Sequence, residues 1–161
     1  MLRDKNLIPL SHQHQHALAL CVRIDRASPI LAADLGPWER EIEQHFRGEI
    51  AIHFAVEEQH VFPVARLYDE LNPLVDDLLM DHAWLRERFA KAESRGLSAG
   101  ELSEFAQRLS AHIRKEERHL FERLQELMSE EDLAELGRRL HEALKSATIA
   151  CALPAQTPRH K

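Results

Sequence analysis

Two stretches of the chain place histidine and glutamate in the same frame and could bind metal. HFAVEEQHVFP at residues 53–63 and HIRKEERHLFE at residues 112–122 both read His, three residues, Glu-Glu, one residue, His, an apolar residue, Phe. The first histidine and the first glutamate of each stretch are four residues apart, so they lie on one face of a helix, one turn above each other. Each stretch therefore offers a two-ligand claw for a cation.

The two claws are His53 with Glu57 and His112 with Glu116, and each lies on the apolar stripe of its helix. That stripe is expected to face the core. Burying an ionised carboxylate without a partner is strongly unfavourable, whereas a metal ion compensates its charge. Neutral imidazole with carboxylate is a ligand set for iron, manganese or zinc. The sequence therefore predicts a cation inside the fold.

The other two long helices each offer one histidine on an apolar face. His82 lies in the middle of such a stripe. In SHQHQHALALC, residues 11–21, His14 shares the apolar face, whereas His12 and His16 fall on a more polar side. We therefore expect His14 and His82 to complete the site.

This ligand set favours a pair of metal ions rather than one, because the two carboxylates are able to bridge. Two histidines per ion and two shared glutamates give each ion about four protein ligands, which leaves room for a bridging oxygen and an exogenous ligand. On reducible iron, the open position would take O2, NO or peroxide. The expected ligands are His14, His53, Glu57, His82, His112 and Glu116.

Further polar residues lie near the claws. His60 and His119 follow the claw histidines by seven residues, and three roles stay open: additional ligands, hydrogen-bond donors to the ligands, or residues at the bundle mouth. Glu58 and Glu117 lie about 100° around the helix and are expected to support the ligands or pair with a neighbouring helix. His45 also precedes a glutamate by four residues, but it lies about 80° around from the claw and is expected at the surface.

Helix signals along the 161 residues predict an all-α protein. The start signals are Ser11, Gly36-Pro37, Asn72-Pro73, the capping box of Ser98 with Glu101, and Ser129. Four long amphipathic helices with short connections predict an antiparallel four-helix bundle, followed by a short extra C-terminal helix. We expect helices at about 11–27, 37–70, 73–96, from 98 onward and at 129–147, within one domain over residues 1–147, and a flexible tail over 148–161.

Composition narrows the class of partner. The 21 basic residues are scattered among 27 acidic ones, which argues against nucleic acid. No apolar run reaches the roughly 20 residues that span a bilayer, and the N-terminus has no apolar segment of a signal peptide, so we expect a cytoplasmic protein without a membrane partner. Cys21 and Cys151 are far apart and show no metal-ligand spacing. The oligomeric state stays open.

With these residues in view, the chain resembles the hemerythrin-like (HHE cation-binding) family over residues 7–128. The resemblance rests on LIPLSHQHQHAL, HFAVEEQHVFP, DHAWL and HIRKEERHLFE, in the pattern H, HxxxE, H, HxxxE. It implies a non-haem di-iron centre in a four-helix bundle, with Glu57 and Glu116 as bridging carboxylates. The same resemblance implies terminal ligands at His14, His53, His82 and His112.

The chain also departs from the oxygen-carrying members of that family. Those carry HxxxH on the third helix and HxxxxD on the fourth, whereas this chain has Arg86 and Glu117 at the corresponding positions. It is more similar to the bacterial single-domain proteins and to iron-centre repair proteins, although it lacks the paired cysteines that precede the bundle in the latter. The resemblance thus implies a role other than simple oxygen carriage.

The function that we expect is that of a non-haem di-iron protein. It would engage O2, NO or peroxide in sensing, detoxification or iron handling, in connection with oxidative or nitrosative stress. One alternative is a peroxidase- or catalase-like oxidoreductase that uses the same site, which leaves the question of enzymatic turnover open. The other is a metal-free helical interaction module.

Overall fold

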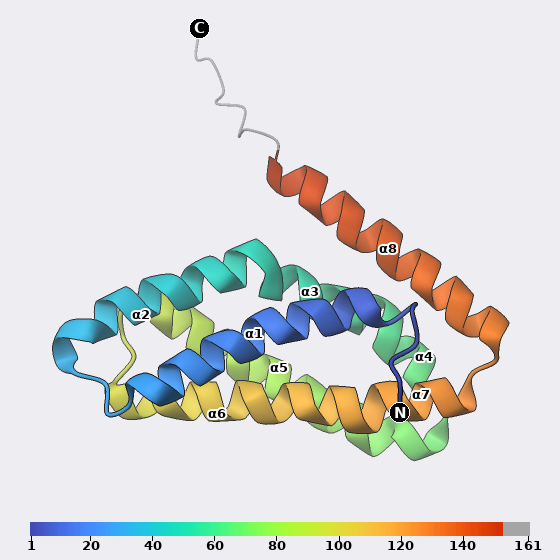
Figure 1. Ribbon diagram of the computed structural model, residues 1–161, viewed down its shortest axis with the longest axis horizontal. Helices are drawn as coiled ribbons and strands as arrows, with labels where there is room; N and C mark the ends of the chain where they lie inside the picture. Colours follow the sequence, from blue (N-terminus) through green and yellow to red (C-terminus); the bar gives the residue numbers. More distant parts are fainter. Residues whose placement is uncertain (153–161) are drawn as a thin grey trace, which may run out of the picture.

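A computed structural model describes the backbone of residues 1–152 and the side chains of residues 1–147. Residues 1–152 form helices and their connections, with no strand. Four long helical rods form an antiparallel bundle, so the prediction of an all-α bundle is confirmed (Figure 1). Around the bundle, α1 packs against α6, α6 against α5, and α5 against α2. The second and fourth rods are therefore diagonal to each other.

The first rod is α1, Ile8–Ala27, and the third is α5, Asn72–Glu93, which follows the short 3-10 helix η3, Asp69–Leu71. The second rod consists of α2, η1, α3, η2 and α4, whose bounds are Ala32–His45, Phe46–Ile50, Ala51–Val56, Glu57–Val61 and Phe62–Ala65. The fourth consists of α6, η4 and α7, whose bounds are Ala99–Lys115, Glu116–Phe121 and Glu122–Leu127. The segments η1, η2 and η4 are π-helical.

The helix starts follow most of the sequence signals. Ser98 and Glu101 form the expected capping box at α6. The Ser129 hydroxyl accepts from the Asp132 backbone N–H at the start of α8, Glu130–Ala152. This last helix runs beyond the expected end at residue 147 and includes residues 148–152. Residues 153–161 lie outside the described part of the chain.

Two expected starts are wrong. Helix α1 begins at Ile8 with Pro9 in its first turn, and the Ser11 hydroxyl donates to a side chain of the fourth rod instead of capping the helix. Helix α2 begins at Ala32 and contains Pro37. Proline lacks a backbone N–H donor, and Leu35, in the turn before Pro37, packs against the apolar core.

The core consists of two apolar clusters rather than one. The first cluster lies between α1, the second rod, α5 and α6 and includes Phe54, Phe89 and Phe105. The second lies toward the other end of the bundle, where Val61 and Leu120 pack with residues of α8. Within the described chain, every helix is too short or too polar to span a bilayer. Between the two clusters lies a buried layer of histidine and glutamate side chains.

Candidate metal centre

The four rods each bring one histidine into this buried layer. His14 lies on α1, His53 on α3, His82 on α5 and His112 on α6, and all four are at most 4% exposed. On each rod, apolar residues of one cluster precede the histidine and residues of the other cluster follow it. The side-chain layer is thus fixed by packing on both sides.

Two glutamates complete the layer. Glu57 and Glu116 have no exposed surface, and each is the first residue of a π-helical segment, η2 and η4 respectively. A π turn contains one residue more than an α turn, and such turns are frequent at functional sites. The two claw glutamates therefore come from the diagonal rods of the bundle and meet at its centre.

The six side chains form two groups that share the glutamates. His14, His53, Glu57 and Glu116 form one group, and His82, His112 and the same two glutamates form the other; within each group the ligand atoms lie within 4.8 Å of one another. We call the pair His14 and His53 the first half-site, the pair His82 and His112 the second half-site, and Glu57 and Glu116 the shared glutamates. No other such group occurs among the described residues.

Each shared glutamate directs one oxygen to each half-site. Glu57 Oε1 lies 3.0 Å from His53 Nε2, whereas its Oε2 lies 3.5 Å from His82 Nε2. Glu116 Oε2 lies 3.1 Å from His14 Nε2, whereas its Oε1 lies 3.2 Å from His112 Nε2. Neighbouring ligands around one ion, each at about 2.1 Å from it, are separated by about 3 Å. The spacing fits two cations bridged by two carboxylates.

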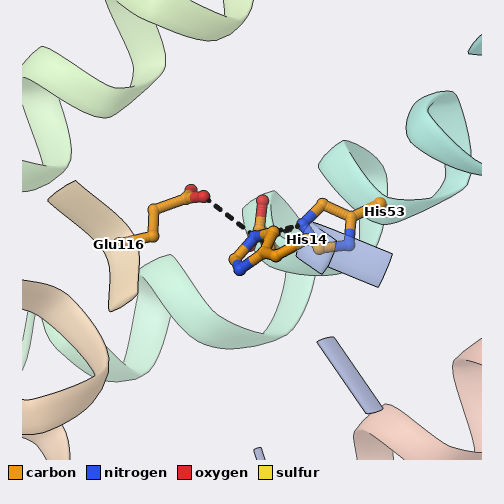
Figure 2. Close-up of side chains that lie close together, drawn as sticks. His14, His53 and Glu116 are labelled. Atoms are coloured by element: carbon orange, nitrogen blue, oxygen red, sulfur yellow. Dashed lines mark hydrogen bonds and ion pairs between the residues drawn. The ribbon is translucent and has the colours of Figure 1, made fainter. Parts of the chain in front are cut away.

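Figure 2 shows the meeting point of three rods at the first half-site. The imidazole of His14 points toward both the Glu116 carboxylate and the ring of His53, with 2.9 Å between the two Nε2 atoms. Two imidazole nitrogens and a carboxylate oxygen thus converge on one small volume. Such convergence is typical of a metal site.

Most inward atoms of this layer lack hydrogen-bond partners, the exceptions being the Nε2 atoms of His14 and His53, which contact each other. Apart from Nε of Arg88, every buried side-chain polar atom without a partner in the described structure belongs to the shared glutamates or the second half-site. Unpartnered buried polar atoms are rare in folded proteins and call for an explanation. A bound cation would satisfy all of the inward atoms at once.

Electrostatics keep the glutamates ionised. Burial raises the pKa of Glu116, but the nearby imidazoles of His112, His14 and His82 outweigh it and hold this pKa well below its usual range. Burial lowers the pKa of His82, but the nearby carboxylates of Glu116 and Glu57 outweigh it and raise this pKa to about 10. The pKa of Glu57 is lowered in the same way, against burial and repulsion from Glu116. The pKa values of His14 and His112 are also raised, so protons on these histidines and on His82 provide the positive charge that a metal ion would replace.

The outward nitrogens of the histidines face a ring of supporting groups. His14 Nδ1 donates to Glu117 Oε1 at 2.6 Å, and His82 Nδ1 donates to Glu58 Oε1 at 2.8 Å. Both glutamates follow a shared glutamate directly in the sequence and bond the histidine of the neighbouring rod, which is the expected supporting role. Such a bond fixes the ring and leaves Nε2 free for a cation.

The sequence analysis missed two members of this ring. Gln13 Oε1 accepts from His53 Nδ1 at 2.7 Å, and Asp81 Oδ2 lies 3.4 Å from His112 Nδ1. Each of the two precedes a lone histidine of the first or third rod. Gln13 directly precedes His14, and Asp81 directly precedes His82. This shared position next to a predicted ligand was the sequence signal that could have identified both residues.

His60 and His119, which follow the claw histidines by seven residues, lie outside the two ligand groups of the described residues. His119 is exposed and His60 is half-buried. The reason is the π turn that starts at each shared glutamate, because its extra residue rotates the following positions back by about 100°. The core positions therefore pass to the next residues, Val61 and Leu120, which are fully buried.

His12, His16 and His45 lie at or near the surface, as expected. His12 and His16 are exposed, and His16 Nδ1 contacts Glu49 Oε1 at 3.1 Å. The side chain of His45 is about 30% exposed, and its Nε2 lies 4.0 Å from Glu41 Oε1. Of the three histidines in residues 11–21, His14 alone is buried in the site.

A small cavity adjoins the first half-site. Its volume is about 10 Å³, and it is bordered by His14, His53 and His112 and by apolar residues such as Ile113. Gln13 and Glu49 line it as well. This volume corresponds to about one water-sized molecule. A very small ligand could therefore approach the layer from this side.

Comparison with known proteins agrees with this geometry. A family model described as the hemerythrin HHE cation binding domain matches residues 9–124. No curated protein and no solved structure matched the chain. The match covers all six residues of the buried layer and ends before α8. Because the family model spans most of the chain and the buried groups are suited to a cation, the chain belongs to the hemerythrin HHE cation-binding domain family.

Proposed function

We propose that this protein binds two iron ions in the buried layer and uses them to engage O2, NO or peroxide, in sensing, detoxification or iron handling. The observation that carries the proposal is the set of unpartnered inward oxygens and nitrogens on the shared glutamates and the second half-site. Two carboxylates without exposed surface need cations, and nitrogen with oxygen ligands suits iron. Family membership supports cation binding in general.

In this proposal each residue of the layer has a distinct role. The shared glutamates would bridge the two ions, and His14, His53, His82 and His112 would hold them through Nε2. Glu117 and Glu58 keep the His14 and His82 rings oriented, and the apolar clusters on either side exclude bulk water. Iron, when bound, supplies Lewis acidity and a reversible Fe2+/Fe3+ change. The cavity beside the first half-site has room for about one water-sized molecule, so a ligand that approaches from this side must be very small.

Elemental analysis of freshly purified protein, together with its visible absorption before and after air, azide and NO, tests the proposal. We expect two irons per chain and absorption bands that change with each ligand. Zinc alone, with no colour change after iron loading, would contradict a redox role. An absence of any metal uptake would favour a metal-free helical interaction module.

Peroxide in excess separates binding from turnover. A binding protein takes up ligand in proportion to its sites, whereas a peroxidase- or catalase-like enzyme consumes many equivalents per site. The matched control is Glu116→Ala, which removes a shared carboxylate. Turnover that persists in this variant would show that the reaction does not use the layer.

A further inference from the structure

The supporting groups of the two half-sites are related by an approximate two-fold symmetry. The supporting glutamates correspond to each other, since Glu117 of the fourth rod bonds His14 of the first, and Glu58 of the second rod bonds His82 of the third. Each also pairs with an arginine, Arg3 for Glu117 and Arg86 for Glu58. At these positions the two half-sites are alike.

The symmetry is broken at the residues that face the claw histidines. His53 is backed by the neutral amide of Gln13, whereas His112 is backed by the carboxylate of Asp81. The two occupy equivalent places, because each directly precedes the lone histidine of its rod. The second half-site thus has one negatively charged supporting group more than the first.

The Asp81 carboxylate is held in place from its outer side. Its Oδ1 accepts from Arg108 at 3.1 Å, and its Oδ2 accepts from Lys115 at 2.6 Å. The same Oδ2 lies 3.4 Å from His112 Nδ1, which is longer than a hydrogen bond, so Asp81 acts on the ring mainly through its charge. Asp81 is only 8% exposed, so water screens this charge little, and the charges of Arg108 and Lys115 offset part of it.

A carboxylate behind a metal-binding histidine raises the basicity of the ligand, and removing such a partner typically weakens metal binding roughly 10- to 100-fold. An amide such as that of Gln13 lacks the negative charge and raises the basicity of the ring less. The surroundings act in the same direction. The ring of Phe54 stacks on His82 with 3.9 Å between centroids. The cavity borders both histidines of the first half-site but, of the second, only His112.

We propose that Asp81 makes the second half-site the tighter of the two metal positions, so that a first ion is held by His82 and His112 before a second is held by His14 and His53. The inference rests on the proposed function, because it requires two ions in the layer. In this role Asp81 is a positioning residue that acts through His112.

Stepwise titration of the metal-free full-length protein with Co2+ tests the inference, followed by calorimetry and by visible absorption. We expect two binding steps in the wild type. Asp81→Asn keeps the shape of the side chain and removes its charge, so it should weaken the tighter step roughly 10- to 100-fold and leave the weaker one unchanged. The matched control is Asp77→Asn, because Asp77 also pairs with Lys115 but does not face the layer.

The reverse change is made at Gln13. Gln13→Glu places a carboxylate behind His53 and should strengthen the weaker step. In the double variant with Asp81→Asn, the order of filling should invert. Anomalous diffraction from crystals grown with one equivalent of Co2+ should place the ion between His82 and His112 in the wild type, and between His14 and His53 in the double variant.

The outcomes separate the inference from the proposed function. No Co2+ uptake by the wild type would overturn both. Two ions bound with equal affinity, or an unchanged tighter step in a folded Asp81→Asn variant, would overturn only the role of Asp81. If Asp81→Asn does not fold, Gln13→Glu still decides, because a weaker step that it leaves unchanged contradicts the inference.

Discussion

The two half-sites use the same residue types in the same frame, but they differ in what surrounds them. The claws are 59 residues apart in the sequence, and each shared glutamate offers one oxygen to each half-site. At the same spacing, Phe54 corresponds to Ile113. Phe54 stacks an aromatic ring on His82, whereas Ile113 places an aliphatic side chain at the equivalent position, and both residues border the cavity. The comparison teaches that a repeated motif supplies the same predicted ligand types, whereas its neighbours decide what each half packs against.

The largest effect is expected when one of the glutamates shared by the two half-sites is removed. Glu57→Ala or Glu116→Ala should abolish retention of both ions, because each carboxylate serves both half-sites. Metal content per chain after dialysis measures the effect. Glu49→Ala is the control and should retain both ions, since Glu49 lies outside the two ligand groups. Loss of a single ion in either variant would sink the bridging role.

Removing a lone histidine should separate the halves. We expect His14→Ala to lose the ion of the first half-site and His82→Ala to lose that of the second, each with one ion retained. Metal analysis gives the number of ions that each variant retains. The Co2+ absorption spectrum shows which half-site is occupied, because the two half-sites have different surroundings.

Histidines outside the layer provide the controls for these variants. His12→Ala, His16→Ala, His60→Ala and His119→Ala should keep the full metal content. A greater loss in His12→Ala or His16→Ala than in His14→Ala would show that the wrong face of α1 was chosen.

A smaller effect is expected from the glutamates that support the histidines. Burial raises the pKa of Glu117, but hydrogen bonds from His14 and Ser11 outweigh it and keep the group ionised. Glu117→Gln should weaken metal binding at the first half-site roughly 10- to 100-fold, and Glu58→Gln should do the same at the second. Competition with a chelator measures both. An effect of Glu117→Gln on the second half-site would contradict the pairing of support and ligand.

The smallest expected effect concerns a donor that only one half has. The Ser11 hydroxyl donates to Glu117 Oε1 at 2.7 Å, whereas Glu58 Oε1 accepts from His82 and Arg86. Ser11→Ala should lower the free energy of unfolding by about 1 kcal/mol, the typical net worth of one such bond. It should also weaken the first half-site slightly and leave the second as it is. Denaturant titration and Co2+ titration measure the two effects.

Local spacing was enough to place the six predicted ligands, which are all buried in one layer. Residues four apart share a helix face whatever the rest of the chain does, so the claws could be found without knowing the bundle. The same reasoning selected His14 over His12 and His16, because one face of that helix is apolar. It also identified the capping box of Ser98 and Glu101, since a cap involves residues within one turn.

Tertiary structure decided the features that depend on contacts between rods. The π turns at the shared glutamates moved His60 and His119 away from the layer, and no local pattern indicates where a backbone adds a residue to a turn. The pairing of Asp81 with His112 joins residues of different rods. The sequence by itself thus determined which residues could bind a cation, because helix periodicity is local. The fold alone decided how each is supported, because that depends on which rods lie side by side.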